Sequence, residues 1–206
     1  RLKTTNSDKF EKIPGNIIAY WISDEFIKAF SNNTLLRELA IPRQGLATMD
    51  NERFTREWHE VDITHTSLAR SANAMWFPYN KGGDYRKWYG NQGLLVNWMD
   101  NGKEIKALAI SRYGSASKRV VNEPSYFKRS ITWSKISSGI PSFRYQPEGA
   151  IFDVAGMSIF PDSEKLTYHL LALLNSSVSL SILSTLSPTV NFEAGQIGAI
   201  PVISPE

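Results

Sequence analysis

Cysteine is absent from this 206-residue sequence. Its absence excludes a disulfide framework and thiolate metal sites, and it fits a reducing cytoplasm. Histidine is scarce as well: His59, His65 and His169 lie far apart and lack the spacing of metal ligands. We therefore expect no metal site and a structural role for each histidine.

Long apolar runs are also missing. The longest, from Tyr168 to Leu186, is interrupted by Asn175 and by several serines, whereas a membrane-spanning helix needs about 20 predominantly apolar residues. The sequence begins at Arg1 without an initiator methionine, and no signal or transit peptide is recognisable. These features predict a soluble, cytoplasmic piece of a longer protein with no membrane contact.

Catalytic motifs are not found either. A nucleotide site needs a glycine-rich loop leading into a helix, because backbone N–H groups must reach the phosphates, and neither G-x-G-x-x-G nor a Walker loop occurs. Residues 122–126 contain the residue types of the Asn/Asp-Pro-Pro-aromatic loop of amino-methyltransferases, but not their spacing. The acids of residues 161–165 resemble a nuclease site but open a helix. We therefore expect no catalytic residue and no cofactor in this sequence.

Positive charge is unevenly distributed along the chain, whose net charge at pH 7 is +3. Residues 1–80 carry ten basic and ten acidic residues, residues 81–144 carry twelve and four, and residues 145–206 carry one and six. The middle segment therefore has a net charge of +8, as expected of a surface that faces a polyanion. A basic solvated surface without a partner is the alternative.

The hydrophobic pattern changes twice along the chain. Helical spacing with a start signal at Ser23-Asp24-Glu25 predicts a helix over residues 17–30, and a second helix over 33–39. From Ser163, an apolar stripe that includes Val178 continues to Leu186 and predicts one long core helix that ends at Pro188. Between these helices, short strand patterns separated by Gly, Pro and Ser cover residues 76–79, 94–98, 131–133, 142–145 and 151–154.

These patterns predict an α+β fold with an irregular β-rich centre and long loops. An N-terminal helical segment and a C-terminal amphipathic helix flank this centre. Residues 100–102 (Asp-Asn-Gly) predict a tight turn, and residues 80–84 predict another. We divide the chain into a polar leader (1–12), an N-terminal α/β segment (13–75) and a β-rich domain with the C-terminal helix (76–206).

Two basic loops of the middle segment are candidate DNA contacts. In the first, cations and aromatic residues follow the Gly82-Gly83 turn; in the second, residues 112–119 include small side chains that let the backbone approach a phosphate. Cations neutralise phosphates, whereas Asn and Arg make paired hydrogen bonds to base edges. The predicted DNA-binding residues are Asn80, Lys81, Arg86, Lys87, Trp88, Arg112, Lys118, Arg119, Arg129 and Arg144.

Each of these features also has a structural interpretation. Trp76, Phe77, Trp98 and Trp133 are typical core residues, and residues 76–90 as a whole are equally consistent with a signature that shapes the domain. Residues 112–119 are also consistent with a solvated loop. Residues 134–138 are rich in serine, which either contacts phosphates or caps a turn.

Several longer motifs occur in a fixed order along the chain. They are residues 42–54 (PRQGLATMDNERF), 58–61, 76–90 (WFPYNKGGDYRKWYG), 131–134, 137–139, 152–156, 170–176, 188–192 and 195–197. In this order they resemble the specificity region of PglX-type DNA methyltransferases, over about residues 13–203. Met49 departs from the family's Gly-Leu-x-Thr-Gly-Asp-Asn pattern, which has glycine at that position.

This resemblance implies a parent enzyme of a BREX phage-defence system, similar to single-chain type II restriction-modification enzymes, with or without restriction activity. It implies an S-adenosylmethionine-dependent domain, preceding this sequence, that methylates adenine N6. Residues 13–75 would join the chain to that domain. The catalytic residues and the cofactor belong to the preceding domain and are not transferred to any residue here.

Two classes of function follow. In the first, the chain is a target-recognition domain that binds double-stranded DNA and sets the sequence specificity of the methyltransferase domain in cis. In the second, it is a docking module for other proteins of the defence complex, and its basic face contacts acidic protein surfaces. Steep loss of duplex binding with rising salt distinguishes the first class from the second.

Overall fold

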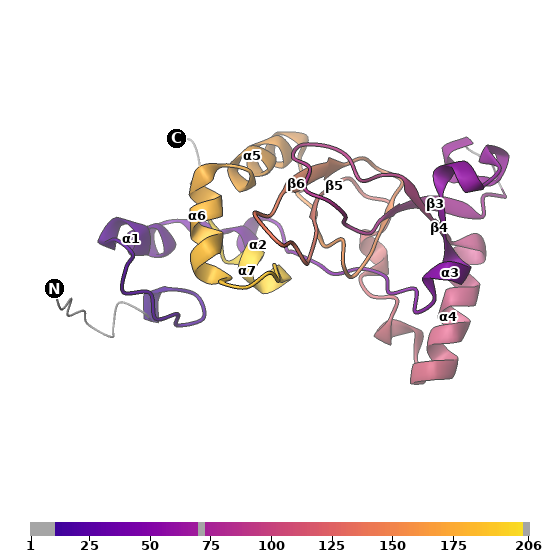
Figure 1. Cartoon of the computed structure of the whole chain (residues 1–206), viewed down its shortest axis with the longest axis horizontal. Coiled ribbons are helices and arrows are strands. Elements are labelled where there is room, and N and C mark those ends of the chain that lie inside the picture. Colours follow the sequence, from indigo (N-terminus) through magenta and orange to yellow (C-terminus); the bar gives the residue numbers. More distant parts are fainter. Residues whose placement is uncertain (1–10, 70–72, 204–206) are drawn as a thin grey trace.

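The computed structural model describes residues 11–69 and 73–203, so the predicted leader lies largely outside the described residues. Figure 1 shows an elongated molecule. Helices α1, α5, α6 and α7 lie at one end, helices α3 and α4 at the other, and small sheets lie between them. Two hydrophobic clusters form the core, one at each end of this arrangement.

The larger core is built on a three-stranded antiparallel sheet in the order β6-β5-β8. Its strands are β5 (Ser130–Trp133), β6 (Phe143–Gln146) and β8 (Ser158–Ile159), and Trp133 is paired with Phe143. All four residues of β5 are buried, the polar Ser130 and Thr132 as well as the apolar Ile131 and Trp133. The helices that join this core are α5 (Glu164–Leu174), α6 (Ser177–Leu186) and α7 (Ala194–Gly198).

The N-terminal segment packs on the same core. Helix α1 (Asp24–Asn32) begins where Ser23 accepts a hydrogen bond from the backbone N–H of Phe26, and it buries Ile27 and Phe30. Strand β1 (Thr34–Leu35) pairs with β9 (Pro201–Val202) near the C-terminus, and the short helix α2 (Leu36–Leu39) follows. Residues far apart in sequence are therefore joined at this end of the molecule.

The second core lies on a four-stranded sheet in the order β2-β4-β3-β7. Its strands are β2 (Thr55–Glu57), β4 (Leu94–Asn97), β3 (Trp76–Asn80) and β7 (Ile151–Phe152), and the β3–β7 pair is parallel. Helix α3 (Asn51–Phe54) and helix α4 (Met99–Tyr113) accompany it. Single turns of 3₁₀ helix connect these elements: η2 (Trp58–Glu60), η3 (Ile63–His65), η4 (Ser67–Ala69), η5 (Ala116–Lys118) and η6 (Glu123–Ser125).

The two cores do not follow the predicted division of the chain at residues 75 and 76. Leu36 and Trp133 share the larger core, whereas Phe54 and Tyr79 share the second. Each core therefore draws on residues from both sides of that boundary. The division remains a prediction about how the chain joins the rest of its parent protein.

The predicted α+β class is confirmed, and the short central strands occur close to where the pattern places them. The two predicted N-terminal helices need correction, and one helix was missed. Residues 17–22 are not helical, so α1 begins only after its Ser23 cap. The second predicted helix is instead strand β1 and a single helical turn. Helix α4 was not predicted, because its start has the Asp-Asn-Gly sequence of a turn.

The predicted single C-terminal helix is in fact two helices. The break falls at Asn175, whose side chain turns inward to bond the backbone of Phe143, and at Ser176, which caps α6 through the N–H of Ser179. The apolar stripe is shifted by this break, so that Val178 is exposed rather than buried. The periodicity of apolar residues in a sequence does not by itself reveal a bend of this kind.

Within the described residues 11–69 and 73–203, no single helix is long and apolar enough to cross a membrane. Helices α5 and α6 together reach the required length and composition, but they are bent by 68° at their junction. Both contribute buried residues to the larger core.

The family's glycine position at Met49 has a physical basis in the fold. Met49 adopts a left-handed backbone with φ of 64°, a conformation that glycine adopts without steric strain. Its side chain packs against the second core and so offsets part of that strain. Met49 therefore adopts a backbone conformation that glycine would favour.

The start of α4 generates a prediction about two glycines. Asp100, Asn101 and Gly102 all have left-handed backbones, and a Cβ on Gly102 would lie 2.4 Å from the Trp98 ring. Gly114 at the other end of α4 is also left-handed, with φ of 79°, but a Cβ there meets no atom within 4 Å. The two positions therefore share backbone strain and differ in steric clash.

We expect Gly114→Ala to reduce the free energy of unfolding by about 1–2 kcal/mol through backbone strain alone. Gly102→Ala should reduce it by about 1–3 kcal/mol more, because the Trp98 ring must move. Thermal unfolding of the two variants measures the difference. Equal losses of stability would contradict the close approach of Trp98 to Gly102.

Candidate nucleic-acid interface

The first predicted DNA-binding loop is held rigidly against the edge of β6. Trp88 N–H donates to the Phe143 carbonyl (3.1 Å), and Tyr145 N–H donates to the Trp88 carbonyl (2.8 Å). Arg86 N–H donates to the Ser142 hydroxyl (3.2 Å). Residues 84–90, which we call the 84–90 loop, are thus fixed by backbone hydrogen bonds although they contain no helix or strand.

A lysine ties the same loop to the helices. The Lys87 ammonium donates to the backbone carbonyl of Asn175 (2.9 Å), at the junction of α5 and α6. The Asn175 side chain in turn accepts from Phe143 N–H (3.1 Å) and donates to the Phe143 carbonyl (2.9 Å). Lys87 therefore anchors the loop to the fold and is half-buried, whereas its neighbour Arg86 is exposed.

Aromatic side chains dominate the exposed side of the 84–90 loop. Tyr85, Trp88 and Tyr89 are 57%, 53% and 58% exposed, far more than is usual for large aromatic residues. Together with the Arg86 guanidinium they combine flat apolar surfaces with positive charge. Sequence reasoning identified the cations and Trp88 but gave no role to the exposed tyrosines.

Asn80 does not lie on this surface. It ends strand β3 and is 2% exposed. Its side-chain amide donates to the Thr132 hydroxyl and to the Gly156 carbonyl (3.0 Å), and its oxygen accepts from Gly82 N–H (3.4 Å). The Asn80 amide therefore joins the two sheets. These bonds occupy most of its donors and acceptors, so few remain to bind a base edge.

Arg144 is a buried charge directly behind the loop. It lies on β6 opposite Trp88 and is 0% exposed. Its guanidinium donates to the Ser142 hydroxyl (3.2 Å) and to the Ser134 hydroxyl (3.4 Å), and it forms no ion pair with any acid in residues 11–69 or 73–203. Desolvation lowers the pKa of Arg144 to about 10. At neutral pH it remains a positive charge that no carboxylate neutralises.

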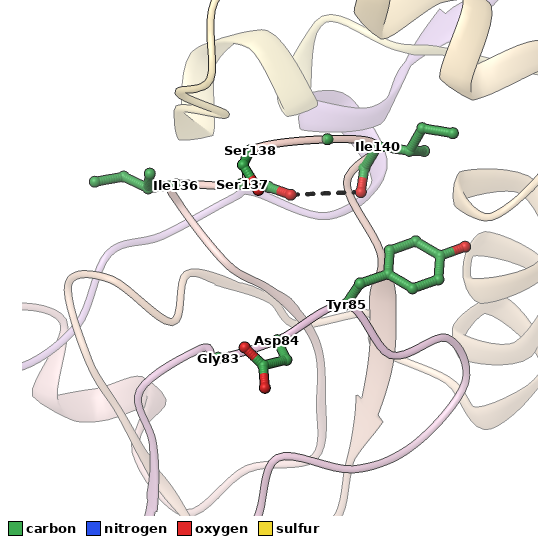
Figure 2. Close-up of a pocket in the computed structure, with 8 residues that line it drawn as sticks. Gly83, Asp84, Tyr85, Ile136, Ser137, Ser138 and Ile140 are labelled. Carbon is green, nitrogen blue, oxygen red and sulfur yellow. Dashed lines mark hydrogen bonds between the residues drawn. The ribbon is translucent and has the colours of Figure 1, made fainter.

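A shallow cleft of about 400 Å³ opens beside the loop. Figure 2 shows Gly83, Asp84 and Tyr85 on one side and the 136–140 segment on the other, and the Asp84 carboxylate points away from that segment. The Ser137 hydroxyl is directed at the Ile140 carbonyl, 3.5 Å away. The predicted serine-rich stretch therefore lines a cleft next to the 84–90 loop.

Lys81 and Arg129 lie at the margins of this surface, and both are half-buried. Burial raises the pKa of the Asp153 carboxyl, while hydrogen bonds from Tyr79 and Ala155 and the charge of Lys81 act in the opposite direction. The Arg129 charge acts on Tyr168 of α5. The charge of Lys81 thus partly stabilises the charged form of Asp153. Arg129 lies close to the exposed Tyr168.

The second predicted loop is in fact the end of α4 and the turn η5. Arg112 lies in the last turn of the helix and donates to the Met49 carbonyl (3.3 Å). The Arg119 guanidinium stacks on the Tyr113 ring, 4.1 Å from its centroid, and Lys118 is exposed. We call Arg112, Lys118 and Arg119 the α4 cluster.

The structure does not bring the 84–90 loop and the α4 cluster together. In Figure 1 the segment after β3 passes over β5 and β6 along the upper edge, whereas the C-terminal end of α4 lies at the lower edge. The positive middle segment of the sequence therefore forms two separate basic sites. In the described part of the chain no group of three or more His, Asp and Glu residues could hold a metal ion.

Comparison with known proteins finds two relatives that match almost the whole chain. It is 40% identical over 208 residues to the adenine-specific methyltransferase PglX of Lacticaseibacillus casei (strain Zhang). It is 36% identical over 204 residues to the adenine-specific methyltransferase BrxX of Escherichia coli O9:H4 (strain HS). Each match covers 98% of this chain but only 17% and 16% of the relative. No family model matches the chain.

The chain is therefore similar, along almost its whole length, to one segment of PglX- and BrxX-type adenine-specific methyltransferases. The resemblance expected from the motifs is confirmed. The chain spans about a sixth of the length of these relatives.

The buried position of Asn80 and the exposed position of Arg86 predict different effects of their substitution on stability. We expect Asn80→Ala to lower the free energy of unfolding by about 2–4 kcal/mol, because the buried Gly156 carbonyl and Gly82 N–H lose a partner. Arg86→Ala, at an exposed side chain, should change it by no more than about 0.5 kcal/mol. Thermal unfolding gives both values. Unchanged stability in Asn80→Ala would contradict a structural role for the Asn80 amide.

Proposed function

We propose that this chain is a target-recognition domain that binds duplex DNA and sets the sequence specificity of an adenine-specific (N6) DNA methyltransferase. The observation that carries the proposal is the 84–90 loop. It presents three exposed aromatic rings and Arg86 from a rigid backbone, with the unneutralised charge of Arg144 behind it. This combination suits a ligand that has both negative charge and flat aromatic groups.

DNA offers both of these properties. Phosphates are recognised by cations and determine how the protein is positioned, whereas sequence is read from the base edges. We assign phosphate contacts to Lys81, Lys87, Lys118 and Arg129, and base or phosphate contacts to Arg86, Arg112 and Arg119. Trp88 contacts a base. Asn80 and Arg144 act indirectly, by holding the loop and by supporting the positive potential.

We infer the activity of the parent protein from the relatives. Adenine-specific methylation is named for both of them, and we infer the same activity for the protein that contains this chain. S-adenosylmethionine would then be bound by a methyltransferase domain in cis, outside this chain, which itself contributes no catalytic residue. A BREX phage-defence or restriction-modification system is the expected context, in the cytoplasm.

A docking role is the second candidate, and a different surface favours it. Ile18, Tyr20 and Trp21 lie in succession before α1, and all three are exposed by more than half. Exposed apolar groups of this kind mark protein contacts. This segment lies at the opposite end of the molecule from α4 (Figure 1). It would contact the methyltransferase domain or another defence protein while the loop binds DNA.

Salt dependence tests the DNA-binding proposal. We expect the 206-residue chain to bind duplex DNA at about 50 mM salt and to lose affinity with a log–log slope of about −0.9 per phosphate contact. Lys118→Ala should make the slope shallower by about one contact. Lys28→Ala on the remote α1 should leave it unchanged. Fluorescence anisotropy measures these slopes, and absence of duplex binding by the wild-type chain would refute the proposal.

Sequence reading by the two exposed arginines is tested by the methylation pattern of an enzyme that contains this chain. Arg86→Ala or Arg112→Ala should relax specificity at one base position, with a loss of about 1–3 kcal/mol of discrimination. Sequencing of the modified bases reports the pattern. If both variants methylate the wild-type sequence alone, neither arginine reads a base.

A further inference from the structure

Trp88 combines a strained backbone with an exposed side chain. Its φ is 74°, in the left-handed region that a bulky residue rarely adopts. The residue is 53% exposed. No ring stacking, cation–π contact or side-chain hydrogen bond to another residue of the described chain involves this indole. The fold thus holds Trp88 in an unfavourable conformation and leaves about half of the residue exposed.

The other left-handed residues in the described chain that are not glycine have a structural reason for that conformation. Two have packed side chains: Met49 lies against the second core, and the Phe127 ring lies 5.6 Å from that of Phe77. The remainder are Asn or Asp, which tolerate this backbone region because their short side chains bond locally. They are Asn16, Asn91, Asp100, Asn101 and Asn122. Trp88 is the exception that neither reason explains.

The backbone on both sides of the ring is fixed. Trp88 N–H and C=O are both bonded to β6, through Phe143 and Tyr145, and Lys87 is bonded to Asn175. Because the backbone that carries the ring is already ordered, little backbone freedom is lost when Trp88 binds a ligand. Trp88 is therefore a flat surface on a preorganised backbone.

The charges nearby determine which ligand suits this surface. Lys81, Arg86 and Lys87 precede the ring, Arg144 lies behind it, and Asp84 is the sole acid of the 84–90 loop. Positive charge beside an exposed indole favours a nucleic acid base next to its phosphate over an apolar protein surface. Trp21 provides the opposite case, because it is 59% exposed but precedes Asp24 and Glu25.

We propose, on the basis of the proposed function, that the Trp88 indole stacks on a nucleobase that has lost a stacking neighbour in duplex DNA. An enzyme that modifies a base must take that base out of the helix, and the bases next to the gap are then unstacked. Aromatic and apolar side chains occupy such gaps in other DNA-binding proteins. Trp88 would be a positioning residue, since it stabilises the opened duplex and performs no chemistry.

The test uses the full 206-residue chain and two duplexes, one intact and one with a single abasic site that creates an unstacked gap. We expect the abasic duplex to bind more tightly and to quench tryptophan fluorescence. Trp88→Ala should weaken that binding by about 5- to 100-fold, the range for loss of one base–aromatic stack. Its salt slope should stay unchanged, because no phosphate contact is lost. Trp21→Ala is the matched control and should bind as the wild type does.

Trp88→Gly separates stacking from a structural role. Glycine relieves the left-handed strain, so the unfolding temperature should stay the same or rise, while affinity falls as it does for Trp88→Ala. A lower unfolding temperature for Trp88→Gly would overturn the inference and assign the ring to the fold. Wild-type affinity in both Trp88 variants would also overturn the stacking inference. The proposed function would still stand in that case if binding by the wild-type chain depends steeply on salt. If the wild-type chain binds neither duplex, both proposals fail.

Discussion

The buried amide of Asn175 connects the parts of this structure. It bonds both backbone groups of Phe143 on β6 and the carbonyl of Leu171 in α5, and the backbone carbonyl of Asn175 accepts from Lys87. A buried polar group without partners is costly, so this network fixes the positions of helix, strand and loop together. The bend between α5 and α6 occurs where the chain must turn this amide inward.

The position of Phe143 extends this constraint to the candidate interface. Its carbonyl accepts from Asn175 and also from Trp88 N–H. The shape of the 84–90 loop therefore depends on contacts with β6 and with the helix junction, and not on local turn preferences alone. A loop whose backbone is held in this way loses less conformational entropy on association than an unconstrained loop.

Charge and structure are linked differently at the two basic sites. Behind the 84–90 loop, Arg144 is buried between two serine hydroxyls and has no carboxylate partner among the described residues, so its charge adds to the field without direct contact. In the α4 cluster, Arg119 stacks on Tyr113 and Lys118 extends into solvent. The first site combines fixed charge with aromatic surface, whereas the second offers cations at a helix end, suited to a phosphate backbone.

The sequence by itself determined the α+β class, the central strands, the Ser23 cap of α1, the resemblance to PglX-type methyltransferases and the basic character of residues 81–144. These depend on local patterns, motifs and composition. Only the tertiary structure decided that Asn80 and Arg144 are buried, that the positive segment divides into two sites, and that the C-terminal stripe bends at Asn175. The reason is that burial and hydrogen-bond partners depend on contacts between residues distant in sequence, such as Asn80 with Thr132, which no local pattern encodes.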